Sequence, residues 1–296
     1  MLTFDDFDAW GDAVSGASLR LACDGVEHRV WTLGIVDLGT VVVQVASEGG
    51  GNVCYGANTH GGPILFVPLT HAAEHVVNGE RLDEASLFAI PSGADFRIRV
   101  RRHAHAWCSI ALPSDIAALD SSTKITCGAE TVARLRHLAS EVVATLADLP
   151  TGTPAHRAAA GELLAAAAAC LPARVEHRSV LGRPRLDRDD IFRRSMAAIE
   201  DAATVPSATA LARGIGVNGR TLLRTFQEAF GLSPKQYLML RELHAVRRSM
   251  SVATAQNETV ADILTRHGIW EFGRFAARYR QHFGELPSET LRRTRA

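Results

Sequence analysis

Two related stretches near the end of the chain decide its fold. The first is ALARGIGVNGRTLLRTFQEAFGLSP, Ala210–Pro234, and the second is ADILTRHGIWEFGRFAARYRQHFGELP, Ala261–Pro287. Both stretches end on Phe-Gly and a proline, and the turn that contains Gly268 has one residue more than the turn that contains Gly216. Each stretch has the order helix, glycine-containing turn, helix, which is the order of a helix-turn-helix unit. We therefore predict two such units, joined by a helix over Pro234–Met250.

The helix after each turn is predicted to have one apolar face. At about 100° per residue, each apolar stripe falls on one side of its helix: Leu222, Phe226 and Phe230 in the first, and Phe272, Phe275, Tyr279 and Phe283 in the second. Arg220 and Arg224 lie opposite the first stripe, and Asn218 stands where an N-cap residue belongs. An arginine pair near a helix start can reach guanine edges in a major groove. The alternative is two small amphipathic helices with solvated arginines, but the presence of two copies favours DNA binding.

Charge is distributed unevenly along this chain of 296 residues, whose formal net charge is zero. Residues 1–120 hold 7 Lys or Arg against 15 Asp or Glu, whereas residues 205–296 hold 14 against 7. An acidic front and a basic back are expected when one end meets a polyanion, although a chance imbalance would look the same.

The sequence indicates a cytoplasmic protein with no membrane partner. A membrane span needs about 18 or more apolar residues and a signal peptide needs a positive start. The chain has no such run, and its first ten residues include three aspartates and no basic residue. The five cysteines are widely scattered: Cys23, Cys54, Cys108, Cys127 and Cys170. This scatter suits free thiols, so we expect no metal site and no cofactor.

The chain is long enough for two domains, and its fold class is predicted as α+β. Residues 1–171 are interpreted as one domain, with a small barrel or sandwich of strands over 15–112 and helices over 115–171. The polar residues 172–188 are interpreted as a linker. Residues 189–296 form the all-helical domain that contains the two units.

Turn signals and alternation support the strands of the first domain. Asp24-Gly25 lies between Leu19–Cys23 and His28–Leu33, and predicts one hairpin. Asn78-Gly79 predicts a second hairpin. Over Phe96–Val100, apolar residues alternate with arginines, which is the period of a strand with one wet and one buried face.

A heptad-like seam marks the helix predicted over residues 129–149. The seam consists of Val132, Leu135, Ala139, Val142, Leu146 and Leu149. Two such helices, one from each subunit, would bury the seam in a homodimer. The alternative is that the seam packs against its own barrel.

At these residues the tail resembles the DNA-binding domain of the AraC/XylS family of bacterial transcription regulators. The matching elements are Leu211-Ala212, Arg220 to Phe226, Gly231-Leu232-Ser233-Pro234, Tyr237, Arg241, Ala245, Gly268, Phe275, and Phe283-Gly284 with Pro287. The resemblance covers about residues 189–296. It implies a sequence-specific transcription regulator, an activator or a repressor, whose two units read successive major-groove segments of double-stranded DNA. RNA polymerase is then a candidate partner.

The resemblance also points to individual DNA-binding residues. In and around the first unit these are Asn218, Arg220, Thr221, Leu223, Arg224, Gln227 and Lys235. In the second they are Glu271, Gly273, Arg274, Ala277, Arg278 and Arg280. Such families place Ala and Gly-Phe around the second turn, whereas here Leu264 and Ile269 stand at those positions, and Leu264 should push the helices apart or repack them. Gly273 and Ala277 remove side chains from the reading face, so we expect the second unit to hold phosphates more than it reads bases.

The first domain resembles the family's cupin-like effector and dimerisation barrel by its strand pattern and its position. The resemblance implies a small-molecule effector in that barrel, with a protein partner as the alternative. The candidate effector-binding residues are Trp31, Tyr55 and Trp107.

Two histidine patterns are weighed against this reading. His71 and His75 match a zinc-protease spacing around Glu74, but the surrounding sequence argues for strand and turn rather than the helix that the metal needs. His103 and His105 could share a barrel face with His60, although a surface pair is the simpler interpretation. A metal-dependent cupin-type enzyme with a DNA-binding tail therefore remains the alternative function, while we predict no catalytic residue.

Overall fold

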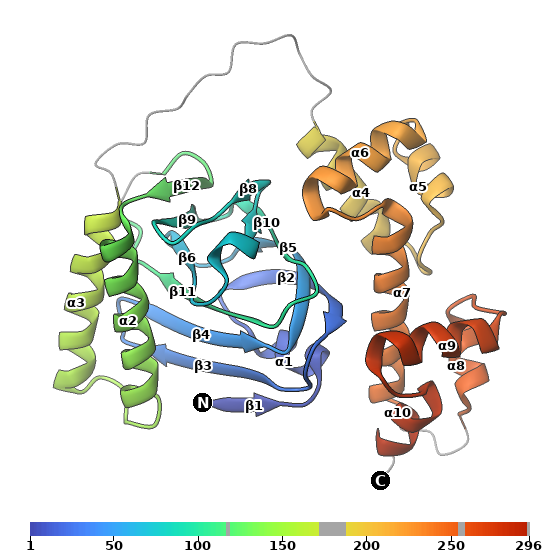
Figure 1. Ribbon diagram of the computed structural model, residues 1–296, viewed down its shortest axis with the longest axis horizontal. Coiled ribbons are helices and arrows are strands. Elements are labelled where there is room, and N and C mark those ends of the chain that lie inside the picture. Colours follow the sequence, from blue (N-terminus) through green and yellow to red (C-terminus); the bar gives the residue numbers. More distant parts are fainter. Residues whose placement is uncertain (117–118, 172–187, 254–257, 295–296) are drawn as a thin grey trace. The chain divides into compact units, whose positions relative to one another are not determined.

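The computed structural model describes residues 1–116, 119–171, 188–253 and 258–294 (Figure 1). The chain divides into two compact units, Met1–Ser179 and Val180–Ala296. Among the described residues, the first contains the strands and three α-helices, and the only regular elements of the second are helices. The predicted linker, residues 172–188, lies outside the described residues except for Arg188, where the first helix of the second unit begins.

Two antiparallel sheets form the body of the first unit, for which a small barrel or sandwich of strands was predicted. The larger sheet has the order β1-β3-β4-β11-β6-β9-β12 and the smaller one β2-β5-β10-β7-β8. Their strands are β1 Leu2–Phe4, β2 Ala17–Val26, β3 Trp31–Asp37, β4 Val42–Glu48, β5 Gly50–Asn58, β6 Ile64–Pro68, β7 Val76–Val77, β8 Glu80–Arg81, β9 Ser86–Ile90, β10 Asp95–Val100, β11 His105–Ala111 and β12 Thr123–Thr126. Helix α1, Phe7–Ala13, and the short 3-10 helix Ala72–Glu74 complete this part.

The alternation of each strand separates two cores. In β11, Cys108 and Ile110 belong to a core that also contains residues of α2 and α3, whereas Trp107 belongs to the core between the sheets. Side chains that are neighbours in a strand point to opposite faces of a sheet. The larger sheet therefore has helices on one face and the smaller sheet on the other.

The hairpin predicted at Asp24-Gly25 is wrong. Strand β2 pairs with β5, while β3 pairs with β1 and β4 in the other sheet. Gly25 has a φ of 91°, and the register of β2 shifts between Cys23 and Val26, so the Asp-Gly pair forms a bulge within one strand. The hairpin predicted at Asn78-Gly79 is confirmed, because β7 pairs with β8 across these two residues, both with positive φ.

The seam predicted to join two subunits packs inside its own unit. Helix α2, Ala129–Leu146, and helix α3, Pro154–Cys170, lie side by side against the larger sheet (Figure 1). Seam residues Val132, Leu135 and Ala139 are fully buried there, and Val142 and Leu146 nearly so. Leu149 lies beyond the end of α2 and is 47% exposed. The predicted intersubunit role of this seam is therefore wrong, since its apolar surface is already covered by the sheet and α3.

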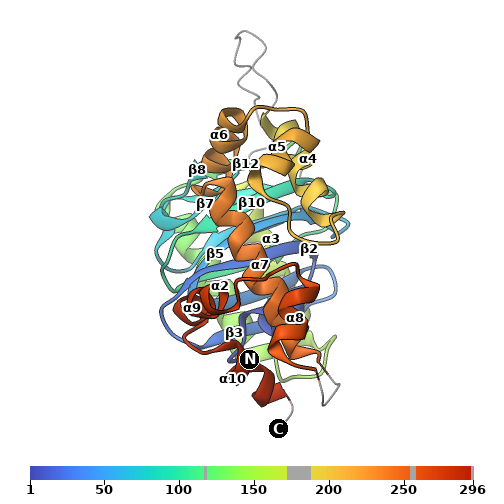
Figure 2. The same cartoon turned by 90° about the vertical axis from the view of Figure 1, so that its right-hand side faces the viewer.

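The second unit has seven helices among its described residues, and α7 links two groups of three (Figure 2). The helices are α4 Arg188–Glu200, α5 Ala208–Gly214, α6 Gly219–Phe230, α7 Pro234–Ser251, α8 Val260–Arg266, α9 Phe272–Phe283 and α10 Pro287–Thr294. The two helix-turn-helix units are thus α5–α6 and α8–α9. The predicted joining helix Pro234–Met250 is confirmed within one residue.

Aromatic stripes form the core of each helix-turn-helix unit. Phe226, Phe230 and Tyr237 stack in the first unit, where the last two rings are 4.8 Å apart between centroids and nearly parallel. Phe275, Tyr279 and Phe283 are buried in the second. Phe272 was predicted to belong to this stripe, but it is the first residue of α9 and is 38% exposed. The buried stripe begins one turn later, at Phe275. Leu264 is buried in the same core, at 1% exposure.

Candidate nucleic-acid interface and internal cavity

The first turn fixes how α6 leaves α5. Gly216 has a φ of 73°, which a residue with a Cβ adopts at a cost, and the Val217 N–H donates to the Ala212 carbonyl at 3.0 Å. The Asn218 side chain then accepts a hydrogen bond from the Thr221 N–H at 2.8 Å. The predicted N-cap is therefore confirmed, and it sets the first residue of α6.

The outer face of α6 carries free basic groups. Arg220, Leu223, Arg224 and Gln227 are exposed, whereas Leu222 on the opposite side is 1% exposed. Neither Arg220 nor Arg224 has an ion pair or hydrogen bond to any described residue. Two guanidinium groups one turn apart on a rigid helix can donate to phosphates or to base edges. Nearby, Asn218 and Lys235 are also exposed, and Thr221 is half-buried.

The second turn repeats this geometry with one added residue. Gly268 also has a φ of 73°, and the Ile269 N–H donates to the Leu264 carbonyl at 2.9 Å. Glu271 is the N-cap of α9 and makes no capping hydrogen bond through its side chain. Trp270, between the turn and the cap, is 72% exposed. Sequence reasoning noticed the extra residue but did not identify it as an exposed tryptophan.

The outer face of α9 carries two exposed arginines, as that of α6 does, but one of them is paired with a carboxylate. Gly273, Ala277 and Arg280 are exposed, and so is Arg274, which donates to Glu271 at 3.2 Å. Arg278 was predicted to lie on this face, but it is half-buried, and its Nε is enclosed without a hydrogen-bond partner. Of the five residues predicted on α9, four lie on the exposed face.

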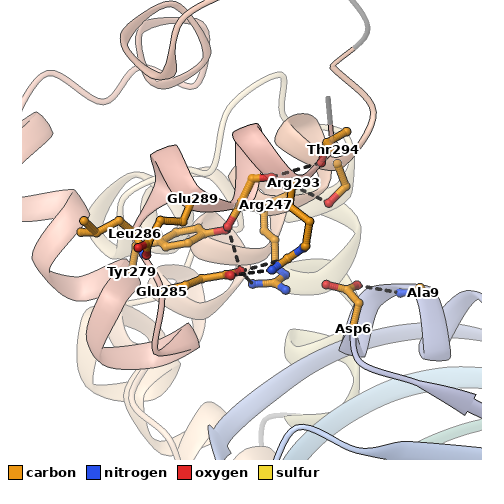
Figure 3. Close-up of polar contacts among 11 residues, drawn as sticks. Asp6, Ala9, Arg247, Tyr279, Glu285, Leu286, Glu289, Arg293 and Thr294 are labelled. Atoms are coloured by element: carbon orange, nitrogen blue, oxygen red, sulfur yellow. Dashed lines mark hydrogen bonds and ion pairs between the residues drawn. The ribbon is translucent and has the colours of Figure 1, made fainter. Parts of the chain in front are cut away.

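Glu285, the residue after the C-cap of α9, is the centre of a polar network (Figure 3). Its carboxylate accepts hydrogen bonds from Arg247 at 2.9 Å, from Arg293 at 2.6 Å and from the Thr290 hydroxyl at 2.9 Å. Burial raises the pKa of Glu285, but hydrogen bonds from Arg293 and Thr290 and the charge of Arg247 outweigh it and lower the pKa to about 2. The network ties α7 and α10 to the residue that follows α9.

A cavity opens between the two sheets of the first unit. It encloses about 630 Å³, including the part open to solvent. Of the three predicted effector-binding residues, Trp107 lines it, whereas Trp31 and Tyr55 are not among its lining residues. Trp31 is buried in the neighbouring core, and Tyr55 follows the lining residue Cys54 in β5, so its side chain belongs to the opposite face. These two predicted positions therefore lie outside the lining of the cavity.

The polar end of the cavity is built around Glu48, which is 1% exposed. Its Oε1 accepts hydrogen bonds from Trp107 Nε1 at 2.8 Å and Asn52 Nδ2 at 3.4 Å, and lies 3.3 Å from His105 Nε2. Burial lowers the pKa of His105, but the charge of Glu48 and its hydrogen bond outweigh burial and raise it. The imidazole is therefore held toward its protonated form beside a carboxylate.

The histidines are grouped differently from the predictions. His105 is buried and lies edge-on to His75, with ring centroids 5.1 Å apart, whereas His60 bonds to the Gly62 N–H. His71 is exposed and the chain after it forms a 3-10 turn, so the two histidines of the zinc-protease pattern do not share a helix face. Burial, and next the charge of His105, lower the pKa of His75 to about 3. Among the described residues, no group of three His, Cys, Asp or Glu side chains could hold a metal ion.

Comparison with known proteins agrees with this geometry. A family model described as "Helix-turn-helix domain" matches residues 211–293. The chain is 34% identical over 118 residues to a "Probable thc operon regulatory protein" of Rhodococcus erythropolis, covering 40% of this chain and 36% of that protein. It is 40% identical over 74 residues to a "XylDLEGF operon transcriptional activator 1" of Pseudomonas putida, covering 25% and 22% respectively. The chain thus matches only 36% and 22% of the length of these two relatives.

A solved structure completes the comparison. "The crystal structure of a probable AraC family transcriptional regulator from Rhodopseudomonas palustris CGA009" has 30% sequence identity and a TM-score of 0.33, covering 36% of this chain and 99% of that one. The C-terminal unit of the present chain is a double helix-turn-helix DNA-binding domain. This unit is similar to the helix-turn-helix part of named operon regulators, which agrees with the resemblance drawn from the sequence. No helix in the described ranges is long and apolar enough to cross a membrane.

Proposed function

We propose that this chain is a sequence-specific, cytoplasmic DNA-binding transcription regulator that responds to a small molecule held between the sheets of its first unit. The observation that carries the proposal is the outer face of α6, where Arg220 and Arg224 are exposed and have no partner among the described residues. A helix held by a glycine turn and an N-cap presents both groups in one fixed orientation. This arrangement suits a helix that enters a major groove by its N-terminal residues.

The two units would divide the work of binding. Helix α6 offers Arg220, Arg224 and Gln227 to base edges, whereas α9 offers Arg274 and Arg280 beside Gly273 and Ala277, which have little to read with. Arginine contacts to phosphate position a protein on DNA, and contacts to base edges specify the sequence. We therefore assign base reading mainly to the first helix-turn-helix unit, α5–α6, and phosphate contact mainly to the second, α8–α9.

The N-terminal unit, Met1–Ser179, would supply regulation. A ligand shifts a conformational equilibrium only if it binds one state better than the other. A cavity lined by both sheets and partly filled with polar side chains is suited to such differential binding. Because relatives are named as operon activators, we propose activation, with RNA polymerase as a partner. Paired copies suit repeated DNA sites, and any homodimer would use a surface other than the buried α2 seam.

The proposal is tested by mapping the chromosomal sites that the full chain occupies and then measuring its affinity for one recovered site. A specific regulator should bind this site at least about a thousandfold more tightly than a scrambled sequence at the same salt concentration. Equal affinity for both sequences would contradict sequence-specific recognition. Arg193→Ala, an exposed arginine of α4 and so outside α6 and α9, is the control for general loss of positive charge.

A further inference from the structure

The cavity between the sheets is mostly apolar, and no lysine or arginine side chain is among its described lining residues. Its apolar wall includes Leu19, Leu21, Phe66, Ile90 and Phe96, contributed by strands from both sheets. None of the described lining residues is a lysine or arginine. A ligand carboxylate in this space would therefore meet no positive charge other than an imidazole that already faces Glu48.

The N–H donors at the polar end are committed to protein acceptors. Gln44 Nε2 donates to the Ser15 carbonyl at 2.9 Å and to the Ser109 hydroxyl at 3.2 Å. Trp107 Nε1 donates to Glu48 at 2.8 Å, and His105 Nδ1 lies 3.1 Å from the Gly50 carbonyl. These groups have little capacity left to receive a ligand that brings only acceptors.

Acceptors, in contrast, are left over. Glu48 Oε2 and Asn52 Oδ1 are enclosed and have no hydrogen-bond partner, although both residues line the cavity. A buried acceptor without a donor costs free energy, and the cost is greater for a charged group. The terminal torsions of Glu and Asn are soft, so a small rotation presents either oxygen to a ligand.

We propose that the cavity takes a small, mostly apolar ligand whose polar end is a hydrogen-bond donor, an ammonium, amide or hydroxyl group, and that Glu48 and Asn52 accept from it. This inference rests on the proposed effector role of the cavity and names the chemical class of the effector. Carboxylates are disfavoured, because they would add a negative charge beside Glu48 in a space without lysine or arginine. The specificity comes from one carboxylate and one amide at the end of an apolar space.

Titration calorimetry on the full chain without DNA tests the proposal with three probes that share a phenethyl body: phenethylamine, phenethyl alcohol and hydrocinnamate. The amine and the alcohol should each bind at least about tenfold more tightly than the carboxylate, the size of one hydrogen bond to a charged group. Hydrocinnamate binding as tightly as phenethylamine, or no binding of any probe at millimolar concentration, would overturn the proposal. The DNA-binding function is unaffected by either result, since no DNA is present.

A variant pair separates Glu48 from the general shape of the cavity. Glu48→Gln should weaken phenethylamine binding about tenfold and remove the discrimination against hydrocinnamate, because the new amide can donate. Tyr55→Phe, which removes a hydroxyl on the face of β5 away from the cavity, should leave the ranking of the three probes unchanged. An unchanged ranking in folded Glu48→Gln contradicts the role of Glu48. If this variant does not fold, the ranking in the unaltered chain decides.

A separate observation concerns Trp270 at the entry of α9. The two turns share their glycine geometry and their closing hydrogen bond, so Trp270 is the residue that the second turn has in addition. The insertion leaves a large aromatic ring 72% exposed next to the Glu271–Arg274 pair. At 72% exposure, the indole is covered only slightly by the described residues of the unit.

We infer that the Trp270 ring contacts DNA beside the groove that α9 enters, against a deoxyribose or a thymine methyl group. This inference rests on the proposed function, because it requires α9 to approach DNA by its N-terminal end. An apolar contact of this kind adds affinity without releasing counterions. It compensates for the small side chains at Gly273 and Ala277.

Acrylamide quenching of tryptophan fluorescence in the full chain tests this contact. The other three tryptophans, Trp10, Trp31 and Trp107, are 1%, 3% and 8% exposed, so the quencher reports mainly on Trp270. Bound DNA should reduce the quenching constant at least about twofold, and Trp270→Ala should weaken binding about five- to tenfold with an unchanged salt dependence. Val252→Ala, another exposed apolar residue, should change neither quantity. Undiminished quenching in a complex shown to form by anisotropy overturns the inference and leaves the proposed function intact; absence of any complex contradicts the function itself.

Discussion

The two helix-turn-helix units have the same turn geometry but close their cores in different ways. Each second helix ends on a glycine in the left-handed region, Gly231 or Gly284. The next residue is Leu232 in the first unit, an apolar side chain that is 3% exposed, and Glu285 in the second, a carboxylate bound by two arginines. An equivalent position in a repeated fold can therefore be filled by hydrophobic packing or by a buried ion-pair network.

The difference has consequences for stability. Apolar packing at Leu232 does not depend on pH, whereas the network at Glu285 requires an ionised carboxylate. Apolar packing also needs no partner of a particular charge, while Arg247, 4% exposed, is held in the interior together with Glu285. The second unit should thus be the one that responds to acid and to loss of a single charge.

The largest effect is expected for Glu285→Ala. The change removes the carboxylate that Arg247 and Arg293 share, and breaking a buried pair from one side costs about 3–5 kcal/mol. Hydrogen exchange of the full chain should show faster exchange in α7 and α10 and little change in α6. Leu232→Ala is the matched control and should affect the first unit instead, at about 2–5 kcal/mol. Unchanged exchange in α10 of Glu285→Ala would show that the network does not stabilise the second unit.

The second largest effect is expected from acid, which should destabilise the second helix-turn-helix unit more than the first. The folded pKa of Glu285, about 2, lies below its ordinary value of 4.5, so its contribution to stability is fully present above pH 4.5 and is lost as the pH falls toward 2. Amides of α10 should lose protection across this window, and those of α6 should lose less. Glu285→Leu, which has no carboxylate at this position, should remove the difference. Parallel loss of protection in both units would contradict the assignment.

The salt dependence of DNA binding should change by a smaller amount when one arginine of α9 is neutralised. Arg280→Ala should reduce the slope of log K against log salt by about 0.9 if its guanidinium contacts a phosphate. The half-buried Arg278 should contribute less than this. Titrations at several salt concentrations, with Arg193→Ala as the control, measure the slopes. Identical slopes for Arg280→Ala and the unaltered chain would show that α9 does not touch the DNA backbone through this residue.

The smallest effect is expected at Gly273. A Cβ added there meets no atom within 4 Å, and alanine should stabilise an exposed helix by about 0.5–1 kcal/mol relative to glycine. If DNA approaches this backbone closely, Gly273→Ala should nevertheless weaken binding. A thermal melt and an anisotropy titration measure the two effects. Equal or tighter binding by the stabilised variant would show that DNA does not approach this glycine.

The helices of the C-terminal unit, Val180–Ala296, could be predicted from the sequence because the signals that start and end them are local. Caps, turn glycines and apolar stripes lie within one or two turns of the residues that they organise, as at Asn218 and Gly216. The Asp24-Gly25 pair shows the limit of such signals, because the same dipeptide serves a bulge and a hairpin. Only the pairing of distant strands distinguishes the two.

The wrong predictions for the N-terminal unit, Met1–Ser179, have a common physical origin. The spacing of Val132, Leu135 and Ala139 predicts a buried stripe correctly, but it carries no information on whether the partner is another chain or the same sheet. The cavity is assembled from strands far apart in the sequence, and one residue of register moves a side chain to the other face. Trp107 faces the cavity and Tyr55 does not for this reason alone.

The central claim is that α6 reads sequence while α9 holds the backbone, and paired variants on one DNA site test it most directly. Arg220→Ala or Arg224→Ala should lose about 1–3 kcal/mol on a specific site and much less on a scrambled one at fixed salt. Arg280→Ala should lose affinity for both sequences alike. Loss on both sequences for the α6 variants would reduce those arginines to phosphate contacts, and no loss at all would contradict the assignment of α6 as the reading helix.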